Sequence, residues 1–437
     1  MNLSLILSII TIICLVLFIL IKPSIQIGKI KLQSFWVVTL MGAISILLFT
    51  PISLETLQHM MTENKGMNPL EILTLFISMS VLSIALDEVG FFKMCAYMAT
   101  KKAKKSQFAL FISISIVVSI LTIFTSNDII ILTFTPFICY FAKHTKINPI
   151  PYLVAEFIFA NTWSMLFVIG NPTNIFLASR FDISFMDYFQ IMALPTFVGG
   201  IVATLLLLLL FRRSLQQPFS YSHEIEQQKM NPFLTIICLI HLLACTILLV
   251  ISAYIDIEMW IIAFISAISL TLIMAFIGII KKDKWIIKVY KRAPWSLIPF
   301  VLSMYVLVLA LDQGGMIQSI GRIFNTICQT KATTIYVYGC TSYLFCNVLN
   351  NIPMSVLFEN IIVSAQPLFL KESIYSAIIS SNIGAYFTPL GALAGIMWMS
   401  ILRNAQVKFG FLQFIKYGAF ISFIVLIATL SVLVGII

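Results

Sequence analysis

Charged residues are scarce in this chain. They fill 10% of its 437 positions, against 60% for hydrophobic residues, and the mean hydropathy is +1.04. That composition excludes a soluble globular domain. Apolar windows of about 20 residues, the length that crosses a bilayer, recur along the whole chain and predict a multi-pass membrane protein.

Several motifs of chemistry are also missing. The eight cysteines form no CxxC pair and the four histidines are dispersed, so neither a zinc site nor a disulfide framework is indicated. No GxxxxGK[ST] loop occurs, so any energy that the protein uses must come from a proton or sodium gradient or from a separate ATPase subunit. HExxH and the nucleophile elbow are absent too, which argues against an enzyme and leaves no cofactor to expect.

The positive charges lie in particular connections between the apolar windows. Most of the 27 basic residues gather at positions 22–31, 93–105, 143–146, 212–229, 281–292 and 403–408. The positive-inside rule places these connections in the cytoplasm, with the protein in the plasma membrane and both termini on the exterior side. Orientation and contact with anionic lipid account for the formal net charge of +10 without a nucleic-acid partner.

Two apolar segments are too short to cross the membrane twice and yet must return to the side they entered. Residues 107–143 are broken centrally by Ser126, Asn127 and Asp128, and residues 332–366 by Asn350 and Asn351. Each segment predicts a re-entrant hairpin whose turn lies near mid-membrane. Non-helical backbone at that depth is tolerated only where protein buries it or a wet cavity faces it.

The two halves of the chain are related. "LSIALDEVGFF" from Leu82 matches "LVLALDQGGMI" from Leu307, and the hairpin turns follow at nearly the same spacing. After each hairpin comes a span interrupted by glycine and proline, at residues 151–180 and 373–402, which predicts a broken helix. Inverted repeats with paired broken helices are typical of secondary transporters, with the binding site at the repeat interface.

The predicted fold is an all-α polytopic protein with about eleven transmembrane helices, two re-entrant hairpins and two broken helices. Residues 1–65 form N-terminal transmembrane helices, 66–213 the first repeat, 214–292 a linking loop with two helices, and 293–437 the second repeat. The two repeats run in opposite senses through the membrane.

Polar residues at the four breaks are predicted to converge on the substrate path. The candidates for substrate or ion binding are Ser126, Asn127, Asp128, Asn161, Gly170, Asn171, Thr173, Asn174, Asn350, Asn351, Asn382, Thr388 and Gly391. Asp128 is foremost, since an ionisable side chain at membrane depth costs about 3 kcal/mol and usually serves a proton, cation or substrate. Its structural alternative is a helix N-cap. Sodium at Asn127 and Asp128 is the single metal site considered.

Three further carboxylates are candidates for gating or coupling. Asp87 and Asp312 lie at the ends of the helices that open the repeats. Glu156 lies early in its span, where a salt bridge to Lys143 or Lys146 is the structural alternative.

Six motifs resemble the arsenical pump membrane protein family, within the wider group that holds sodium/proton antiporters and divalent anion/sodium symporters. They are "LDEVGFF", "SND" with "LTFTP", "FDISFMDYFQIMALP", "APWSLIPFVLSMYVLV", "NNIPMSVL" and "TPLGALAGIMWMSIL". The resemblance implies export of arsenite or antimonite in exchange for protons, alone or with an ATPase subunit. The chain departs from the family pattern at Ile129, Ile130 and Ile131, where small residues are typical, and at Asn382, where aspartate is common.

The leading hypothesis is therefore proton-coupled export of arsenite, antimonite or a similar small inorganic solute by alternating access. A sodium/proton antiporter and a sodium-coupled dicarboxylate transporter are the alternatives, although Asp128 would repel a dianion. The expected partners are the solute and the lipid bilayer. The sequence does not decide whether the protein forms a homodimer or binds a cytoplasmic ATPase subunit.

Overall fold

The computed structural model describes residues 3–22, 24–27, 30–50, 52, 55, 56, 58, 68–102, 106–217 and 230–437. Within these residues the chain is almost entirely helical, apart from an antiparallel pair of short strands, β1 (Ser24–Ile27) and β2 (Ile30–Gln33). The basic clusters are described except for Lys29, Lys104, Lys105 and Lys229, which lie outside these residues, as do most of positions 51–67.

Seven described helices are long and apolar enough to cross a membrane. They differ in how far protein covers them: 78% of the apolar window of α4 (Pro69–Glu88) is buried, against 33% for α12 (Met259–Lys281). Apolar side chains that remain exposed on α12 and on α11 (Pro232–Ile255) form faces suited to lipid. The helix α4 therefore belongs to the interior of the bundle, and α11 and α12 to its periphery.

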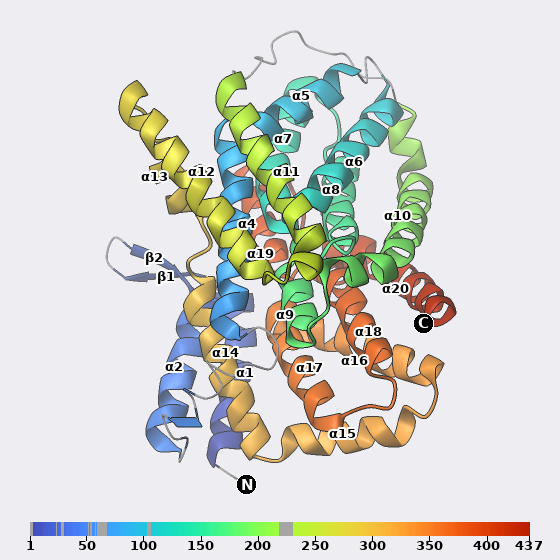
Figure 1. Ribbon diagram of the computed structural model, residues 1–437. Coiled ribbons are helices and arrows are strands. Elements are labelled where there is room, and N and C mark those ends of the chain that lie inside the picture. The colour runs from blue at the N-terminus through green and yellow to red at the C-terminus, as the bar shows by residue number, and fades with distance from the viewer. Residues whose placement is uncertain are drawn as a thin grey trace.

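The first repeat contains two hairpin helices and one broken helix between longer helices. Its elements are α4, α5 (Phe91–Lys102), α6 (Gln107–Phe124), α7 (Asn127–Thr145), α8 (Ile150–Trp163), η1 (Val168–Gly170), α9 (Pro172–Arg180) and α10 (Phe185–Leu215). In Figure 1 the hairpin α6–α7 lies in the upper part of the molecule.

The second repeat has the same order of elements. They are α14 (Leu297–Gln313), α15 (Met316–Ile327), α16 (Lys331–Leu349), α17 (Asn351–Ala365), α18 (Leu370–Ile383), η2 (Gly384–Tyr386), α19 (Leu393–Asn404) and α20 (Phe411–Ile436). The hairpin α16–α17 lies in the lower part of Figure 1, opposite α6–α7. The predicted fold class, with two hairpins and two broken helices in inverted repeats, is confirmed.

Helices outside the repeats complete the molecule. They are α1 (Leu3–Ile21), α2 (Ser34–Phe49), α11, α12 and α13 (Trp285–Arg292). The N-terminal end of α1 lies at the bottom of Figure 1, and α5 and α13 lie toward the top. We call the end with α5 and α13 the basic face, because residues 93–102 and 281–292 carry basic side chains there.

Both hairpins turn within one or two residues. The first turns at Thr125 and Ser126, and α7 follows with Ser126 as its extended N-cap residue. The second turns at Asn350, whose positive φ of 81° reverses the chain in a single step. Asp128 is thus a first-turn residue rather than the N-cap, where the helix dipole still favours its negative charge.

Each broken helix is closed by a glycine. A Cβ on Gly170 would lie 2.3 Å from the carbonyl oxygen of Ser164, and a Cβ on Gly391 would lie 2.3 Å from that of Gly384. These separations exclude any side chain. The two glycines are therefore required by the close backbone approach at each break.

The repeats interlock through their hairpins. α7 packs against α19, and α17 packs against α9, so the second helix of each hairpin contacts the other repeat's broken helix. We call α6–α9 together with α16–α19 the hairpin core. Beside it, α1, α2, α4, α13 and α14 pack on one another, and we call these five helices the frame.

Candidate transport site

A cavity of about 330 Å³ lies in the seam between the frame and the hairpin core. Residues of the frame helices, of β2 and of the connection between α13 and α14 form one part of its wall: Ile19, Gln33, Phe35, Phe76, Ser80, Ile84, Lys291, Arg292, Ala293, Pro294, Ser296 and Leu297. Hairpin-core residues on its wall are Ser126, Asp128, Ile129, Leu132, Leu393, Ile396 and Met397. The cavity thus joins the first hairpin turn to the start of the second repeat's α19, and the second hairpin turn is not on its wall.

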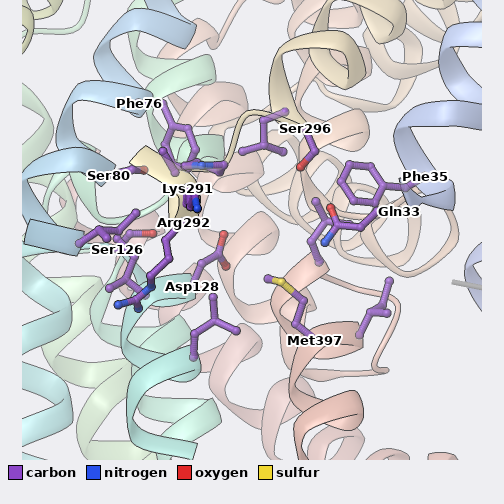
Figure 2. Close-up of a pocket in the computed structure, with 18 of the residues that line it drawn as sticks. Gln33, Phe35, Phe76, Ser80, Ser126, Asp128, Lys291, Arg292, Ser296 and Met397 are labelled. Carbon is purple, nitrogen blue, oxygen red and sulfur yellow. The ribbon is translucent and has the colours of Figure 1, made fainter. Parts of the chain in front are cut away.

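Asp128 is the acidic side chain on this wall. In the view of Figure 2 its carboxylate lies between Ser126 and Arg292 on one side and Met397 and Gln33 on the other. It makes no hydrogen bond or ion pair with any residue that the structure describes. A carboxylate held at this depth without a protein partner is available to a proton, a cation or a solute hydroxyl.

Most of the wall is apolar, and its polar groups are few. Hydroxyls come from Ser80, Ser126 and Ser296, and positive charge from Lys291 and Arg292. Apolar walls with a few placed polar groups are typical of small-solute sites.

The guanidinium of Arg292, on the cavity wall, is engaged by two carboxylates. Its Nη2 donates to Asp87 Oδ2 at 2.6 Å and its Nη1 to Glu88 Oε1 at 2.5 Å. Short charge-assisted bonds of this forked kind are strong and directional. Asp87, predicted as a gate residue, therefore ties α4 to the end of α13 beside the cavity.

Residues next to Asp128 fill two different roles. Ile129 lies on the cavity wall, whereas Ile130 and Ile131 are fully buried and are not on it. Asn127 Nδ2 donates to Asn161 Oδ1 at 2.9 Å, and Asn161 Nδ2 to the Phe157 carbonyl oxygen. These two asparagines anchor the first hairpin turn to α8.

The other polar candidates of the first break meet Asn382 of the second repeat. Asn382 Oδ1 accepts from Asn171 Nδ2 at 2.8 Å and from Ser164 Oγ at 2.9 Å, and its Nδ2 donates to Asn174 Oδ1 at 2.7 Å. Thr173 Oγ1 and Ser381 Oγ lie 2.8 Å apart beside them. This buried network joins the two broken helices where they cross.

The second hairpin turn is bound to its own break. Asn350 Nδ2 donates to the Leu390 carbonyl oxygen, and the Asn351 amide to that of Gly391, both at 3.0 Å. Thr388 Oγ1 donates to Asn347 Oδ1 at 2.7 Å. None of these six residues is on the cavity wall. The structure therefore brings Ser126 and Asp128 to the cavity and places the other predicted site residues at the two breaks behind it.

The salt bridge to Lys143 or Lys146 that was considered for Glu156 is wrong. Instead of snorkelling or pairing with Lys143 or Lys146, Glu156 is 0% exposed and accepts hydrogen bonds from Thr135 Oγ1 at 2.9 Å and Trp398 Nε1 at 3.3 Å. Glu156 was expected near the basic connection because it lies early in its span. The helix α8 is short and packed on all sides, so the carboxylate is buried instead. Asp312, at the far end of α14, accepts from Gln318 Nε2 at 2.7 Å and lies away from the cavity.

Sequence reasoning missed a second buried carboxylate. Glu359 on α17 pairs with Arg180 Nε at 3.2 Å and accepts from Tyr305 OH at 3.2 Å. An acidic residue inside an apolar window was the available signal, since such residues are rare at membrane depth. Within the described residues, no three His, Cys, Asp or Glu side chains gather in a way that could hold a metal ion.

Comparison with known proteins identifies the family of this chain. A family model described as citrate transporter matches residues 15–374. The chain belongs to the citrate transporter family. With seven spanning helices described, this member of the citrate transporter family is a multi-pass membrane transporter.

Individual relatives confirm the resemblance seen in the motifs. The chain is 26% identical over 372 residues to the arsenical pump membrane protein of Yersinia enterocolitica, and 25% identical over 376 residues to that of Escherichia coli K12. Both alignments cover 82% of this chain and 84% of the relative. A putative arsenical pump membrane protein of Bacillus subtilis is 24% identical, covering 90% of this chain and 91% of its own.

A solved structure shares the fold of this citrate transporter family member. The YdaH transporter of Alcanivorax borkumensis, whose crystal structure is described as having an unusual topology, superposes with a TM-score of 0.60 at 13% identity. The match covers 99% of this chain and 98% of that one.

Proposed function

We propose that this transporter exports arsenite, antimonite or a similar small uncharged hydroxide in exchange for protons, with Asp128 as the exchanging group. The observation that carries the proposal is the unpaired Asp128 carboxylate on the wall of a largely apolar cavity. The relatives named arsenical pump membrane protein support the solute class.

The chemistry of the cavity suits this solute. Arsenious acid is uncharged near neutral pH and carries hydroxyl groups, so its transfer into an apolar space costs much less than that of an anion. A deprotonated Asp128 can accept hydrogen bonds from those hydroxyls, and Ser126 adds a hydroxyl from the same turn.

Exchange follows from competition at a single carboxylate. When Asp128 takes a proton, it loses charge and acceptor capacity, which weakens its hold on the solute. Proton binding and solute binding are therefore mutually antagonistic, and that reciprocity is what antiport requires. No cofactor beyond the proton gradient enters this scheme. The basic face is the cytoplasmic one in this proposal, so the cavity takes solute from the cell interior.

A carboxylate solute is the second candidate. The exposed Lys291 on the cavity wall and the citrate transporter description favour it. Against it, Arg292 is already engaged by Asp87 and Glu88, and Asp128 would repel an anion.

The test is transport by purified protein in liposomes. Uptake of arsenite, antimonite, sodium and citrate would be measured separately under an imposed pH gradient and under an imposed sodium gradient. The proposal expects arsenite or antimonite movement against an opposing proton flux, with no requirement for sodium. Citrate movement that depends on sodium, with arsenite and antimonite inert, would replace it with the second candidate.

A further inference from the structure

The buried group of Glu359, Arg180 and Tyr305 lies on the side of the molecule away from the basic face. Glu359 belongs to α17 and Arg180 to α9, both in the hairpin core, whereas Tyr305 belongs to α14 of the frame. The Tyr305 hydroxyl therefore crosses the seam in which the transport cavity lies. Glu359 is 3% exposed and Tyr305 5%.

The internal repeat shows what this contact corresponds to in the first half of the chain. In the alignment that matches Leu82 with Leu307, Tyr305 corresponds to Ser80 on α4. In the alignment of the hairpin turns, which matches Asn127 with Asn351, Glu359 corresponds to Thr135 on α7.

The seam between the frame and the hairpin core is open at the first-repeat position and closed at the second-repeat position. Ser80 lies on the cavity wall, so the seam is open beside it. Among the described residues, the Thr135 hydroxyl hydrogen-bonds only within the hairpin core, to Glu156 and to the Ile131 carbonyl oxygen. On the other side, Tyr305 and Glu359 close the seam with a hydrogen bond, and Arg180 balances the buried charge.

A hollow of about 490 Å³ lies beside the C-terminal end of α9, and its wall includes Ser179, the neighbour of Arg180. The wall also carries the carboxylates of Glu71, Asp182, Asp256 and Glu258. The end of α9 that holds Arg180 is therefore next to a polar space.

We propose that Tyr305 and Glu359, with Arg180, form the gate that closes the substrate path on the face opposite the cavity. The frame and the hairpin core must separate at this hydrogen bond when the transporter opens to that face, as they are separated at Ser80 here. Glu359 and Tyr305 are positioning residues in this scheme, and neither touches the solute. The gate rests on the transporter function, and it holds for any solute.

The gate makes a prediction about the free protein. Tyr305→Phe removes only the hydroxyl, and Glu359→Gln removes the charge while keeping an acceptor. Both variants destabilise the state seen here relative to the state open on the other face. Loss of a buried hydrogen bond to a charged group shifts such an equilibrium by about tenfold.

Accessibility of a cysteine on the cavity wall measures the shift. Leu132→Cys places a thiol on the cavity wall, and a water-soluble maleimide labels it at a rate set by the population open to the basic face. Labelling would be quantified on the peptide that contains residue 132, so that the native cysteines do not interfere. No solute is needed, which separates a failure of the gate from a failure of the proposed function.

The expected result is a labelling rate lower by up to about tenfold with Tyr305→Phe, a smaller decrease with Glu359→Gln, and faster amide hydrogen exchange at the ends of α9 and α17. Tyr343→Phe is the matched control, because that buried hydroxyl bonds Ser422 at 2.6 Å between α16 and α20, away from the seam. An unchanged labelling rate in folded Tyr305→Phe would overturn the proposal, as would an equal decrease with Tyr343→Phe.

Discussion

The two repeats share their framework and differ in the chemistry that it carries. Both use a glycine to close the break, at Gly170 and Gly391, and both bury an asparagine before it, at Asn161 and Asn382. At the turns they diverge, because Asp128 of the first hairpin corresponds to the apolar Ile352 of the second. The repeat supplies a symmetric scaffold, and one copy alone supplies the cavity carboxylate.

The largest effect is expected where the two copies are most alike. Gly170→Ala and Gly391→Ala each place a Cβ 2.3 Å from a backbone oxygen, so the backbone at the break must move. We expect each to cost about 3 kcal/mol or more, the upper range for overpacking. Thermal unfolding in detergent measures the loss. Gly435→Ala is the control, because no atom lies within 4 Å of its added Cβ.

Unequal losses of stability in Gly170→Ala and Gly391→Ala would show that the two breaks are not equivalent. Full stability of either variant would mean that the close approach is not essential at that break.

The matched asparagines should separate the repeats. Asn382→Ala removes side-chain bonds to Ser164, Asn171 and Asn174 in the other repeat, whereas Asn161→Ala removes one bond to another side chain, that of Asn127 in its own repeat. We expect a loss of about 3 kcal/mol for Asn382→Ala and about 1 kcal/mol for Asn161→Ala, since unsatisfied buried partners add to the cost. Denaturant unfolding of the two variants checks the order, and a greater loss at Asn161 would contradict it.

Weakening the hydrogen bonds of Glu156, the buried carboxylate of the first repeat, should have a smaller effect on stability. Among the described residues, the side chains of Thr135 and Trp398 donate to Glu156, and Thr135→Val removes the first of these bonds and leaves the second in place. We expect a decrease in stability of about 1 kcal/mol with little change in transport, because neither residue is on the cavity wall. A transport defect larger than the loss of folded protein would give Glu156 a direct part in coupling.

The smallest effect is expected at the cavity wall beside Asp128. Ile129→Ala enlarges the cavity, and we expect a change of a few-fold in the apparent affinity for the solute, with a smaller loss of stability than for a side chain packed on all sides, because Ile129 is 6% exposed and borders the cavity. Ile130→Ala is the matched comparison: it truncates a fully buried side chain and should cost about 2–5 kcal/mol. Similar stability losses in the two variants would show that Ile129 packs as core rather than lining the site.

Much of this arrangement could be predicted from the sequence. The lengths of the apolar segments and the placement of the basic residues predicted both hairpins. Glycine and proline within the later spans predicted the two breaks, and the polar interruption of the first hairpin predicted that Asp128 lies at its turn. The partners of the polar residues could not be predicted in the same way. Whether Asn382 faces solute or Asn171, and whether Glu156 meets Lys143 or Trp398, depends on how helices rotate against one another. The Tyr305–Glu359 contact joins helices that no local pattern pairs.

The central claim is that an unpaired carboxylate in the cavity exchanges a proton for the solute, and Asp128→Asn tests it most directly. Gradient-driven transport of arsenite or antimonite would be measured in liposomes for this variant and for Asp312→Asn, which removes the carboxylate at the end of α14, away from the cavity. We predict that Asp128→Asn folds normally but loses gradient-driven transport, while Asp312→Asn retains it. Full proton-coupled transport by Asp128→Asn would contradict the account.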